Sequence, residues 1–567
     1  MPGTIIEGGI SPSQVSAPGL YVSILPPPAI VRGAPSNIGA LVGSATWGPT
    51  NIPVFCGSMS DYLRNFGQIP SLSASYQAPT APAPVNPADM GTYALAAFQQ
   101  AQNGAGIGIW CVRVADSSAA AATVAAKDTT TPTAVTGITL NAKYLGTTGN
   151  GITVSIAVGS KGGNNFTVTI SPPPGLGIPA EVFANIAGTT PATANSPFWN
   201  SLNAALANGI AGGRGPSNLL VGASPSSTAE NPALATYTLT GGADGTTLTS
   251  GAVSLNYGTS GNLAQLEISS LSTTPPAGMY ALAGLGVDAF CLCGWGNGSG
   301  TTYAQGEGTA FAAVEAFAQS IGAAFISGLP AGVENNTGDA VTLVQSNPDD
   351  WICFYVKDRQ VLNDGLNALR LVDAAPFTLG RYLASPPQNS LLNTTVVSGG
   401  SARSSSLGSP APYSQGEIGL CQNGRILLLA KPIPSGNVMG FATGVNGSSN
   451  VATAPTEYTA MTLLIAKSLA AAFGKFVGGS NLQGPVDPDP VRSGVETALA
   501  NFLESLRAAG QIADYSAQCD LSLNSQANIA SHYLFATASA KYLSSVWFFF
   551  LSFTGGTTVQ VNVQQGS

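Results

Sequence analysis

Charge is what this sequence has least of. Only 8% of its 567 residues are Asp, Glu, Lys or Arg, against about 25% in typical soluble proteins. The formal net charge is −8, and the basic residues are few and dispersed, which excludes the clustered positive surface that nucleic-acid binding requires. Because charge keeps an isolated surface soluble, so neutral a chain is typical of a subunit surrounded by copies of itself. A neutral globular monomer is the simpler alternative.

Histidine is nearly absent, since His532 is the single one. This excludes most histidine-based metal sites and leaves one possible base for a catalytic triad. No glycine-rich loop ends in Gly-Lys-Ser/Thr, and no Gly-x-Ser-x-Gly elbow occurs. The acidic pairs Asp349–Asp350 and Asp487–Asp489 are interpreted as a solvated turn and as a helix start. We therefore expect no enzymatic activity, no metal and no cofactor, and we expect His532 to lie in a turn or to pack.

Long hydrophobic runs are also missing. No window offers 18 uninterrupted apolar residues, since the best candidates are cut by Asp288 and Lys467, so we expect no membrane insertion. The stretch Met1–Thr4 lacks the features of a secretory signal. The cysteines are odd in number and scattered, which favours buried free thiols in a reducing cytoplasm. They are Cys56, Cys111, Cys291, Cys293, Cys353, Cys421 and Cys519.

The clearest local pattern begins near residue 486. Asp489 can cap a helix, and Pro490 at the first helical position loses nothing by lacking an N–H. Apolar residues then recur every three or four positions up to Leu506, which predicts one buried helix face. Gly510 follows at the position where a glycine commonly ends a helix. We therefore expect a helix over 490–509.

Two further strands are expected after that helix. Residues 546–551 are six consecutive apolar residues, mostly aromatic, and predict a strand covered on both faces. Gly555 and Gly556 then form a hinge, and residues 557–563 alternate strictly. A terminal strand behind a hinge needs an edge to pair with, and another molecule can supply it. The residues on one face of this C-terminal arm are Thr557, Val559, Val561 and Val563.

A short strand-like piece also stands alone near the start of the chain. Prolines bracket it on both sides, and without neighbours it cannot fold by itself. We expect it to lie on its own domain or on another subunit. Its residues are Leu20, Tyr21, Val22, Ser23 and Ile24.

The rest of the chain divides by pattern. Residues 38–114 combine short buried strands with helices, whereas 135–242 contain short strands separated by turn residues, which predicts an inserted all-β domain. From about residue 246, strands separated by helical patterns predict a largely parallel sheet. Asn423-Gly424, between two apolar segments, predicts a β-hairpin, and a long amphipathic helix follows over 458–476.

The order of these features resembles contractile-tail sheath proteins. At the C-terminus the similarity lies in the capped helix, Gly510, Tyr515, Cys519-Asp520, Asn524, Ile529 and the two strands. At the start it lies in Pro18-Gly19-Leu20-Tyr21-Val22, Gly48-Pro49 and Val112-Arg113-Val114. The hairpin and the helix after it resemble the Mu-like branch of the family. The similarity is strongest over 18–66 and 486–563.

The resemblance implies a multidomain α+β or α/β fold. Its core would be a discontinuous α/β body built from the two halves of the chain, with an inserted all-β domain and extended arms. The expected segments are an N-terminal arm (1–28), a first core segment (29–115), a linker (116–134), the inserted domain (135–245), an α/β middle domain (246–385), a loop (386–412), the C-terminal core domain (413–554) and the C-terminal arm (555–567).

The resemblance also implies a function. Sheath subunits stack as six-fold rings around an inner tube, and they contract without nucleotide to drive the tube through a target envelope. Expected partners are copies of this chain, the tube protein, and baseplate and tail-terminator proteins, in a virion tail assembled in host cytoplasm. The candidate tube-facing residues on the predicted helix are Arg492, Glu496, Glu504 and Arg507, and a merely solvated helix face is the alternative.

Three other functions compete with this one. A surface-layer or adhesin-like protein would share the low charge, but it would need an export signal. A hydrolase with an unfamiliar serine site would require an activity that survives His532→Ala. A non-contractile tail-tube protein is disfavoured because tube subunits are normally far smaller.

Overall fold

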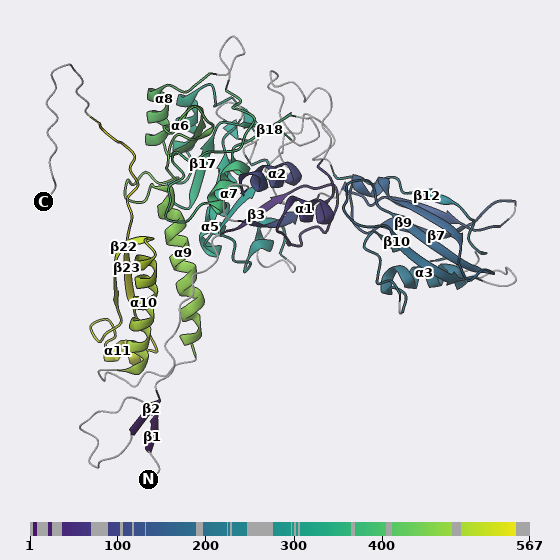
Figure 1. The fold of residues 1–567 in the computed structure, drawn as a ribbon, viewed down its shortest axis with the longest axis horizontal. Coiled ribbons are helices and arrows are strands. Elements are labelled where there is room, and N and C mark those ends of the chain that lie inside the picture. The colour runs from purple at the N-terminus through teal and green to yellow at the C-terminus, as the bar shows by residue number, and fades with distance from the viewer. Residues whose placement is uncertain are drawn as a thin grey trace, which may run out of the picture.

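The computed structural model of the chain is a mixed α/β structure with several sheets, and Figure 1 shows a central body from which two further regions extend. It describes residues 4–7, 21–24, 37–69, 89–101, 106–115, 118–130, 132–188, 197–211, 213–223, 225–226, 230–245, 276–295, 298–299, 302–303, 307–330, 332–363, 369–403, 411–478 and 489–551.

An eight-stranded sheet forms the central body, in the order β21-β20-β17-β16-β13-β3-β5-β4. The six inner strands are parallel, as their separation by helical patterns predicts, and the edge strands β21 and β4 are antiparallel. The strands are β3 (Ile38–Gly43), β4 (Val54–Cys56), β5 (Gly108–Arg113), β13 (Ala289–Leu292), β16 (Ala324–Gly328), β17 (Cys353–Lys357), β20 (Ile426–Ala430) and β21 (Gly440–Phe441).

One sheet thus joins strands from both sides of the inserted segment. Residues 246–385, expected to be a separate middle domain, share this sheet with residues 29–115. The reason is that β13 pairs with β3 along its full length, so the buried faces of both segments merge into one hydrophobic core.

Helices pack on this sheet at close range. They are α1 (Met59–Phe66), α2 (Met90–Gln100), α5 (Glu307–Ile321), α6 (Thr337–Gln345), α7 (Ala375–Ala384) and α8 (Gln415–Asn423). Helices α2 and α7 meet where a Cβ on Gly380 would lie 2.2 Å from the carbonyl oxygen of Ala97. Because a side chain there would collide with backbone, glycine at position 380 is what allows the two helices to approach so closely.

The predicted hairpin around Asn423-Gly424 is wrong. Residues 415–423 form α8, and a capping box joins Ser414 to Glu417 at its start. Gly424 ends that helix, with its N–H on the carbonyls of Leu420 and Cys421. The Ser-x-x-Glu signature of a helix start therefore outweighs the Asn-Gly turn signal.

Residues 120–245 form two smaller sheets with their own core. Sheet order is β10-β9-β8-β12 in one and β11-β7-β6 in the other, and α3 (Pro197–Asn208) packs with them. The strands are β6 (Thr123–Lys127), β7 (Thr136–Ala142), β8 (Thr153–Val158), β9 (Asn165–Ser171), β10 (Glu181–Ala187), β11 (Leu220–Gly222) and β12 (Thr236–Thr238). The expected linker 116–134 contains β6, so its small residues belong to the fold.

The inserted region is fixed to the central body by buried side chains. Trp47, from the loop after β3, is 1% exposed and belongs to the core of the inserted region, where its ring meets Tyr144 edge-on at 5.2 Å. Arg113, at the end of β5, is fully buried and donates to the carbonyls of Gly48 and Leu145, each at 2.8 Å. Burial lowers the pKa of Arg113 to about 10, and the carboxylate of Asp244 opposes that effect.

The third region is a C-terminal unit that lies below the central body in Figure 1. It consists of α9 (Thr456–Phe473), α10 (Pro490–Ala508), β22 (Ile512–Gln518), α11 (Gln526–Ala530) and β23 (Thr537–Tyr542). Helix α9 connects it to the sheet, where Lys467 Nζ lies 2.8 Å from Asp288 Oδ1. Residues 413–554 thus contribute to two cores, because β20 and β21 belong to the central sheet and α10 does not.

Four two-stranded sheets complete the described structure, and β22–β23 of the C-terminal unit is one of them. The others pair β1 (Thr4–Glu7) with β2 (Tyr21–Ile24), β14 (Gly298–Ser299) with β15 (Thr302–Tyr303), and β18 (Gln360–Asn363) with β19 (Leu369–Val372). The sequence predicts a loop over residues 386–412, and the described residues of that range form no helix and no strand.

Both ends of α10 match the sequence prediction. Asp489 accepts from the N–H groups of Val491 and Arg492, with Pro490 at the first position. Gly510 follows the helix with φ of 66°. The cap satisfies two amide donors that the helix itself leaves unpaired.

Replacing Asp489 with alanine is expected to lower the free energy of unfolding by about 1–2 kcal/mol, because the first-turn amides of α10 lose their acceptor. A urea titration followed by circular dichroism would measure the loss. Asp489→Asn keeps a capping oxygen and should recover most of it. Equal stability of the alanine and wild-type proteins would show that the cap contributes nothing.

Candidate assembly surfaces

The C-terminal unit is a helix pair packed on a two-stranded sheet. Its core joins Met461 and Leu464 of α9 to Phe502 and Leu503 of α10, with Ile512 at the start of β22. Strands β22 and β23 pair antiparallel from Ile512 with Tyr542 to Gln518 with Thr537. Neither strand is among the sequence predictions, because polar and small residues interrupt the apolar alternation in both.

The aromatic run 546–551 is exposed, and here the sequence prediction is wrong. A strand covered on both faces is expected, but the described structure assigns the run no strand. The exposed fractions are 71% for Phe548, 81% for Phe549 and 92% for Phe550. Val546 and Leu551 are 71% and 77% exposed. Trp547 is half-buried, with its indole nitrogen buried, whereas the described part of this chain leaves the other five residues of the run open.

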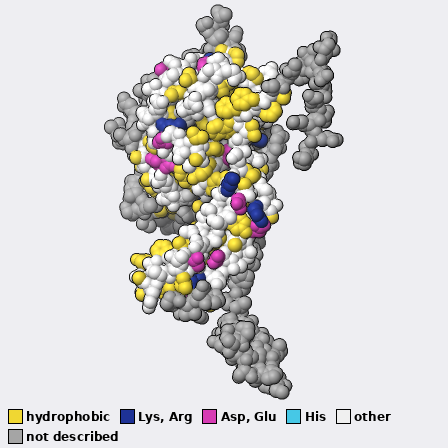
Figure 2. Space-filling view, turned by 90° about the vertical axis from the view of Figure 1, so that its left-hand side faces the viewer, with side chains coloured by type: hydrophobic (Ala, Val, Ile, Leu, Met, Phe, Trp, Pro, Cys, Tyr) yellow, Lys and Arg dark blue, Asp and Glu magenta, His cyan; other side chains and the backbone are white. Residues whose placement is uncertain are grey.

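So exposed an apolar stretch is a candidate association surface. Soluble monomers rarely display contiguous apolar patches of this kind, and those that do generally use them for binding. On the face of the molecule drawn in Figure 2, charged side chains are few and are scattered among hydrophobic and neutral polar ones. Hydrophobic contact and backbone pairing are therefore the interactions that the run itself can offer.

Most of the predicted N-terminal arm strand lies within the described residues, whereas the predicted C-terminal arm lies outside them. Tyr21 to Ile24 form β2, which pairs in parallel with β1 of the same chain, and Leu20 lies outside the described residues. The hinge Gly555–Gly556 and the strand residues Thr557, Val559, Val561 and Val563 also lie outside them. Donation of either arm to another subunit stays a prediction.

The candidate tube-facing residues on α10 do not share one exposed face. Arg492 is 2% exposed, so it is buried in this chain and the prediction for it needs correction. Its position in the first turn places it beside Val495, on the apolar side. Glu496 is half-buried, whereas Glu504 and Arg507 are more open and form an ion pair at 2.8 Å.

The charge pair on α10 extends towards β22. The hydrogen bond from Arg507 lowers the pKa of Glu504, and the guanidinium carbon of Arg507 lies 5.7 Å from the ring centre of Tyr515. Such exposed pairs contribute little to stability. They are available for a partner.

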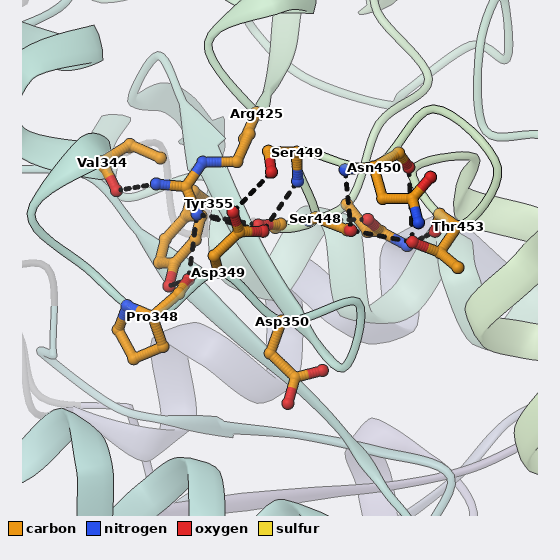
Figure 3. A network of polar contacts seen from close by, with 12 residues as sticks. Val344, Pro348, Asp349, Asp350, Tyr355, Arg425, Ser448, Ser449, Asn450 and Thr453 are labelled. Carbon is orange, nitrogen blue, oxygen red and sulfur yellow. Dashed lines mark hydrogen bonds and ion pairs between the residues drawn. The ribbon is translucent and has the colours of Figure 1, made fainter.

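The polar network in Figure 3 is an alternative candidate site. Arg425 donates to the carbonyls of Val344 (2.8 Å), Pro348 (3.1 Å) and Gly447 (2.9 Å), and Asp349 accepts from the Ser449 amide at 2.7 Å. Partial burial opposes ionisation of Asp349, but the hydrogen bonds from Ser449 outweigh it and lower its pKa. The turn predicted at Asp349–Asp350 is thus anchored by Ser449.

The position of this network indicates a structural role. It lies before β17 and β20, at the amino ends of parallel strands, whereas open α/β sheets bind ligands at the carboxyl ends. Arg425 satisfies carbonyls at the end of α6 and in the segment that leads to α9. The network therefore fixes where α9 leaves the central body.

Catalytic and metal-binding chemistry has little support among the described residues. His532 has φ of 63° and lies in the turn after α11, as predicted. All seven cysteines are free and buried, also as predicted. Within the described ranges, no three His, Cys, Asp or Glu side chains gather as a metal site would require. None of the described helices is both long and apolar enough to cross a membrane.

Comparison with known proteins identifies the fold. No family model matches the sequence, and no curated protein matches it. The crystal structure of the sheath tail protein from Desulfitobacterium hafniense matches with a TM-score of 0.51 and 15% identity, over 88% of this chain and 93% of that chain. The sheath tail protein from Listeria innocua matches with a TM-score of 0.52 and 13% identity, over 90% of this chain and 96% of that chain. The chain therefore has the fold of the sheath tail proteins.

Proposed function

We propose that this chain is the structural subunit of a contractile tail sheath, without enzymatic activity. It polymerises as stacked six-fold rings around an inner tube and contracts to drive the tube through a target envelope. The shared fold supports the proposal, since it extends over 88% and 90% of this chain in the two comparisons. The motif order from residue 18 to residue 563 supports it independently.

The observation that carries the proposal is the exposed aromatic run 546–551. A subunit that worked alone would lose solubility by displaying three phenylalanines at 71% exposure or more. A subunit in a helical array covers such a run with a neighbour. The run leads directly into the hinge and arm at 555–567, so the arm and the aromatic run engage the same neighbour.

This arrangement would allow subunits to move relative to one another while they stay linked. Backbone pairing holds a donated strand to a neighbouring sheet edge, and the hinge at Gly555–Gly556 lets the subunit rotate about that link. The energy for contraction comes from subunit–subunit surface that forms only in the contracted state. A ligand-free change of this kind requires that the final state have a lower free energy than the first.

The inner tube is the proposed partner of the C-terminal unit. Glu504 and Arg507 present an exposed charge pair there, and Glu496 lies two turns before Glu504 on α10. Baseplate and terminator proteins would cap the two ends of the array.

The direct test is negative-stain electron microscopy of the purified full-length chain, alone and mixed with a tube protein from the same gene cluster. Hollow tubes or stacked rings with six-fold end views are the expected result. Dispersed particles in both samples would contradict the proposal.

Deleting residues 555–567 is expected to leave a folded subunit that no longer polymerises, because the donated strand is gone. Circular dichroism would check the fold, and electron microscopy would check assembly. A variant with Gly555 and Gly556 intact but residues 564–567 removed is the matched control, and it should still assemble. Normal tubes from the longer deletion would rule out strand donation, and an unfolded product would mean that the strand serves its own subunit.

A further inference from the structure

A buried carboxyl group lies at the carboxyl edge of the central sheet. Asp358 directly follows β17, is 3% exposed and has φ of 84°. Positive φ is uncommon for a residue with a side chain, and Asp and Asn adopt it more readily than most.

The side chain of Asp358 reaches a separate segment of the chain. Its Oδ2 accepts a hydrogen bond from the Ser401 hydroxyl. Its Oδ1 is buried and has no hydrogen-bond partner among the described residues. An ionised carboxylate with one buried oxygen unpaired costs more free energy than a protonated carboxyl in the same place.

Ser401 belongs to a segment that lies along β18. In this segment, residues 398–403, the amide of Gly399 donates to Val361 O at 2.7 Å, and the amide of Ala402 donates to Arg359 O at 2.8 Å. The amide of Arg403 donates to Ser401 Oγ at 2.9 Å. The Ser401 hydroxyl thus links Asp358, at the end of β17, to segment 398–403.

The charged groups around Asp358 would not fully neutralise a negative charge on its carboxylate. Glu334, from the loop after β16, is a second buried carboxylate, and Arg359 is committed to it at 2.8 Å. Lys357 Nζ points to Thr337 Oγ1 at 3.1 Å and to the Tyr413 hydroxyl at 3.3 Å.

Two more titratable groups, Tyr413 and Cys421, face the same carboxyl. Burial raises the pKa of both, to about 11 for Cys421. Both therefore stay neutral in the pH range where a carboxyl titrates, and they cannot compensate a charge on Asp358.

We propose that Asp358 is a proton-operated latch, which holds segment 398–403 on β18 when protonated and loosens it when ionised. The latch is a property of the folded subunit and does not depend on its assembly. It needs no ligand other than a proton.

The direction of the pH effect follows from the change in proton binding. Burial raises the pKa of Asp358 to about 7 in the closed form, with the Ser401 hydrogen bond opposing the shift, and opening returns it to the ordinary range. Opening therefore releases a proton between these values, so it becomes easier as pH rises towards 7 and levels off above it. Acid closes the latch.

Hydrogen–deuterium exchange of the full-length chain, read by mass spectrometry, tests the latch. Exchange of peptides that cover 398–403 and 360–363, corrected for the intrinsic pH dependence with an unstructured peptide, gives the opening equilibrium. We expect it to increase by up to about tenfold per pH unit between about pH 5 and 7. β9, in the inserted region, serves as an internal reference and should show no such trend.

Three variants separate the latch from general destabilisation. Asp358→Asn, which tolerates the positive φ, should remove the pH trend. Ser401→Ala keeps the titrating group but removes the donor that opposes its pKa shift, so the transition should move to higher pH. Asp349→Asn, whose carboxyl has a lowered pKa, should behave as wild type. A pH-independent wild type, or a trend that survives in Asp358→Asn, would overturn the proposal.

Discussion

Replacing Phe548, Phe549 and Phe550 together with serine is expected to abolish assembly and to leave a folded, soluble subunit. These side chains are 71–92% exposed in the chain, so each change should alter subunit stability by no more than about 0.5 kcal/mol. In an assembly that buries them, each ring contributes about 1.5–3 kcal/mol. The combined loss lowers the association constant by at least about a thousandfold.

Sedimentation velocity and electron microscopy would measure assembly, and circular dichroism would confirm the fold. The matched control is Val451→Ser, which changes a residue of similar exposure, 77%, outside the run. It should assemble normally. Tubes from the triple variant would show that the aromatic run is not an interface. Loss of the fold would show that the run is buried within its own subunit.

Replacing Trp47 with alanine is expected to detach the inserted region from the central body. Its indole is 1% exposed and lies in the core of residues 120–245 although it belongs to the loop after β3. Removing it costs about 3–5 kcal/mol in lost burial and cavity formation. Trp47 belongs to the loop after β3, but its indole packs in the core of residues 120–245. Most of the lost free energy therefore weakens the junction between the central body and the inserted region.

Limited proteolysis would detect the detachment as faster cleavage near residues 115–120, with the central sheet retained by circular dichroism. Trp47→Phe keeps an aromatic ring against Tyr144 and should lose less than half as much. Unchanged proteolysis of the alanine variant would show that Arg113 and its hydrogen bonds hold the junction without the indole.

Local signals in the sequence predicted much of this fold. The helix over 490–509 is confirmed as α10 with both of its ends, because Asp489, Pro490 and Gly510 act within one helical turn. The strands expected at 38–43 and 323–327 are confirmed as β3 and β16, because short apolar runs between helices have few alternatives other than a parallel sheet. Burial of the seven cysteines is confirmed, and most of them lie in such runs.

Competing local signals account for the errors. Asn423-Gly424 predicted a turn, but the capping box at Ser414–Glu417 starts a helix that runs through Asn423. The linker expected at 116–134 contains β6 because small residues fit a strand that is covered on one side. At the candidate site, residue type assigns Arg492 to a polar face, whereas the packing of α10 buries it.

The sequence by itself determined the mixed α/β class, the ends of α10, the neutral character of the chain and the resemblance to sheath proteins. These depend on residue types and on neighbours within a few positions. Only the tertiary structure decided that one sheet joins both halves of the chain, that Trp47 and Arg113 fix the inserted region, and that residues 546–551 are exposed. Such features depend on which distant segment, or which other molecule, covers an apolar surface, and an apolar run has the same composition whether its own chain or a neighbour buries it.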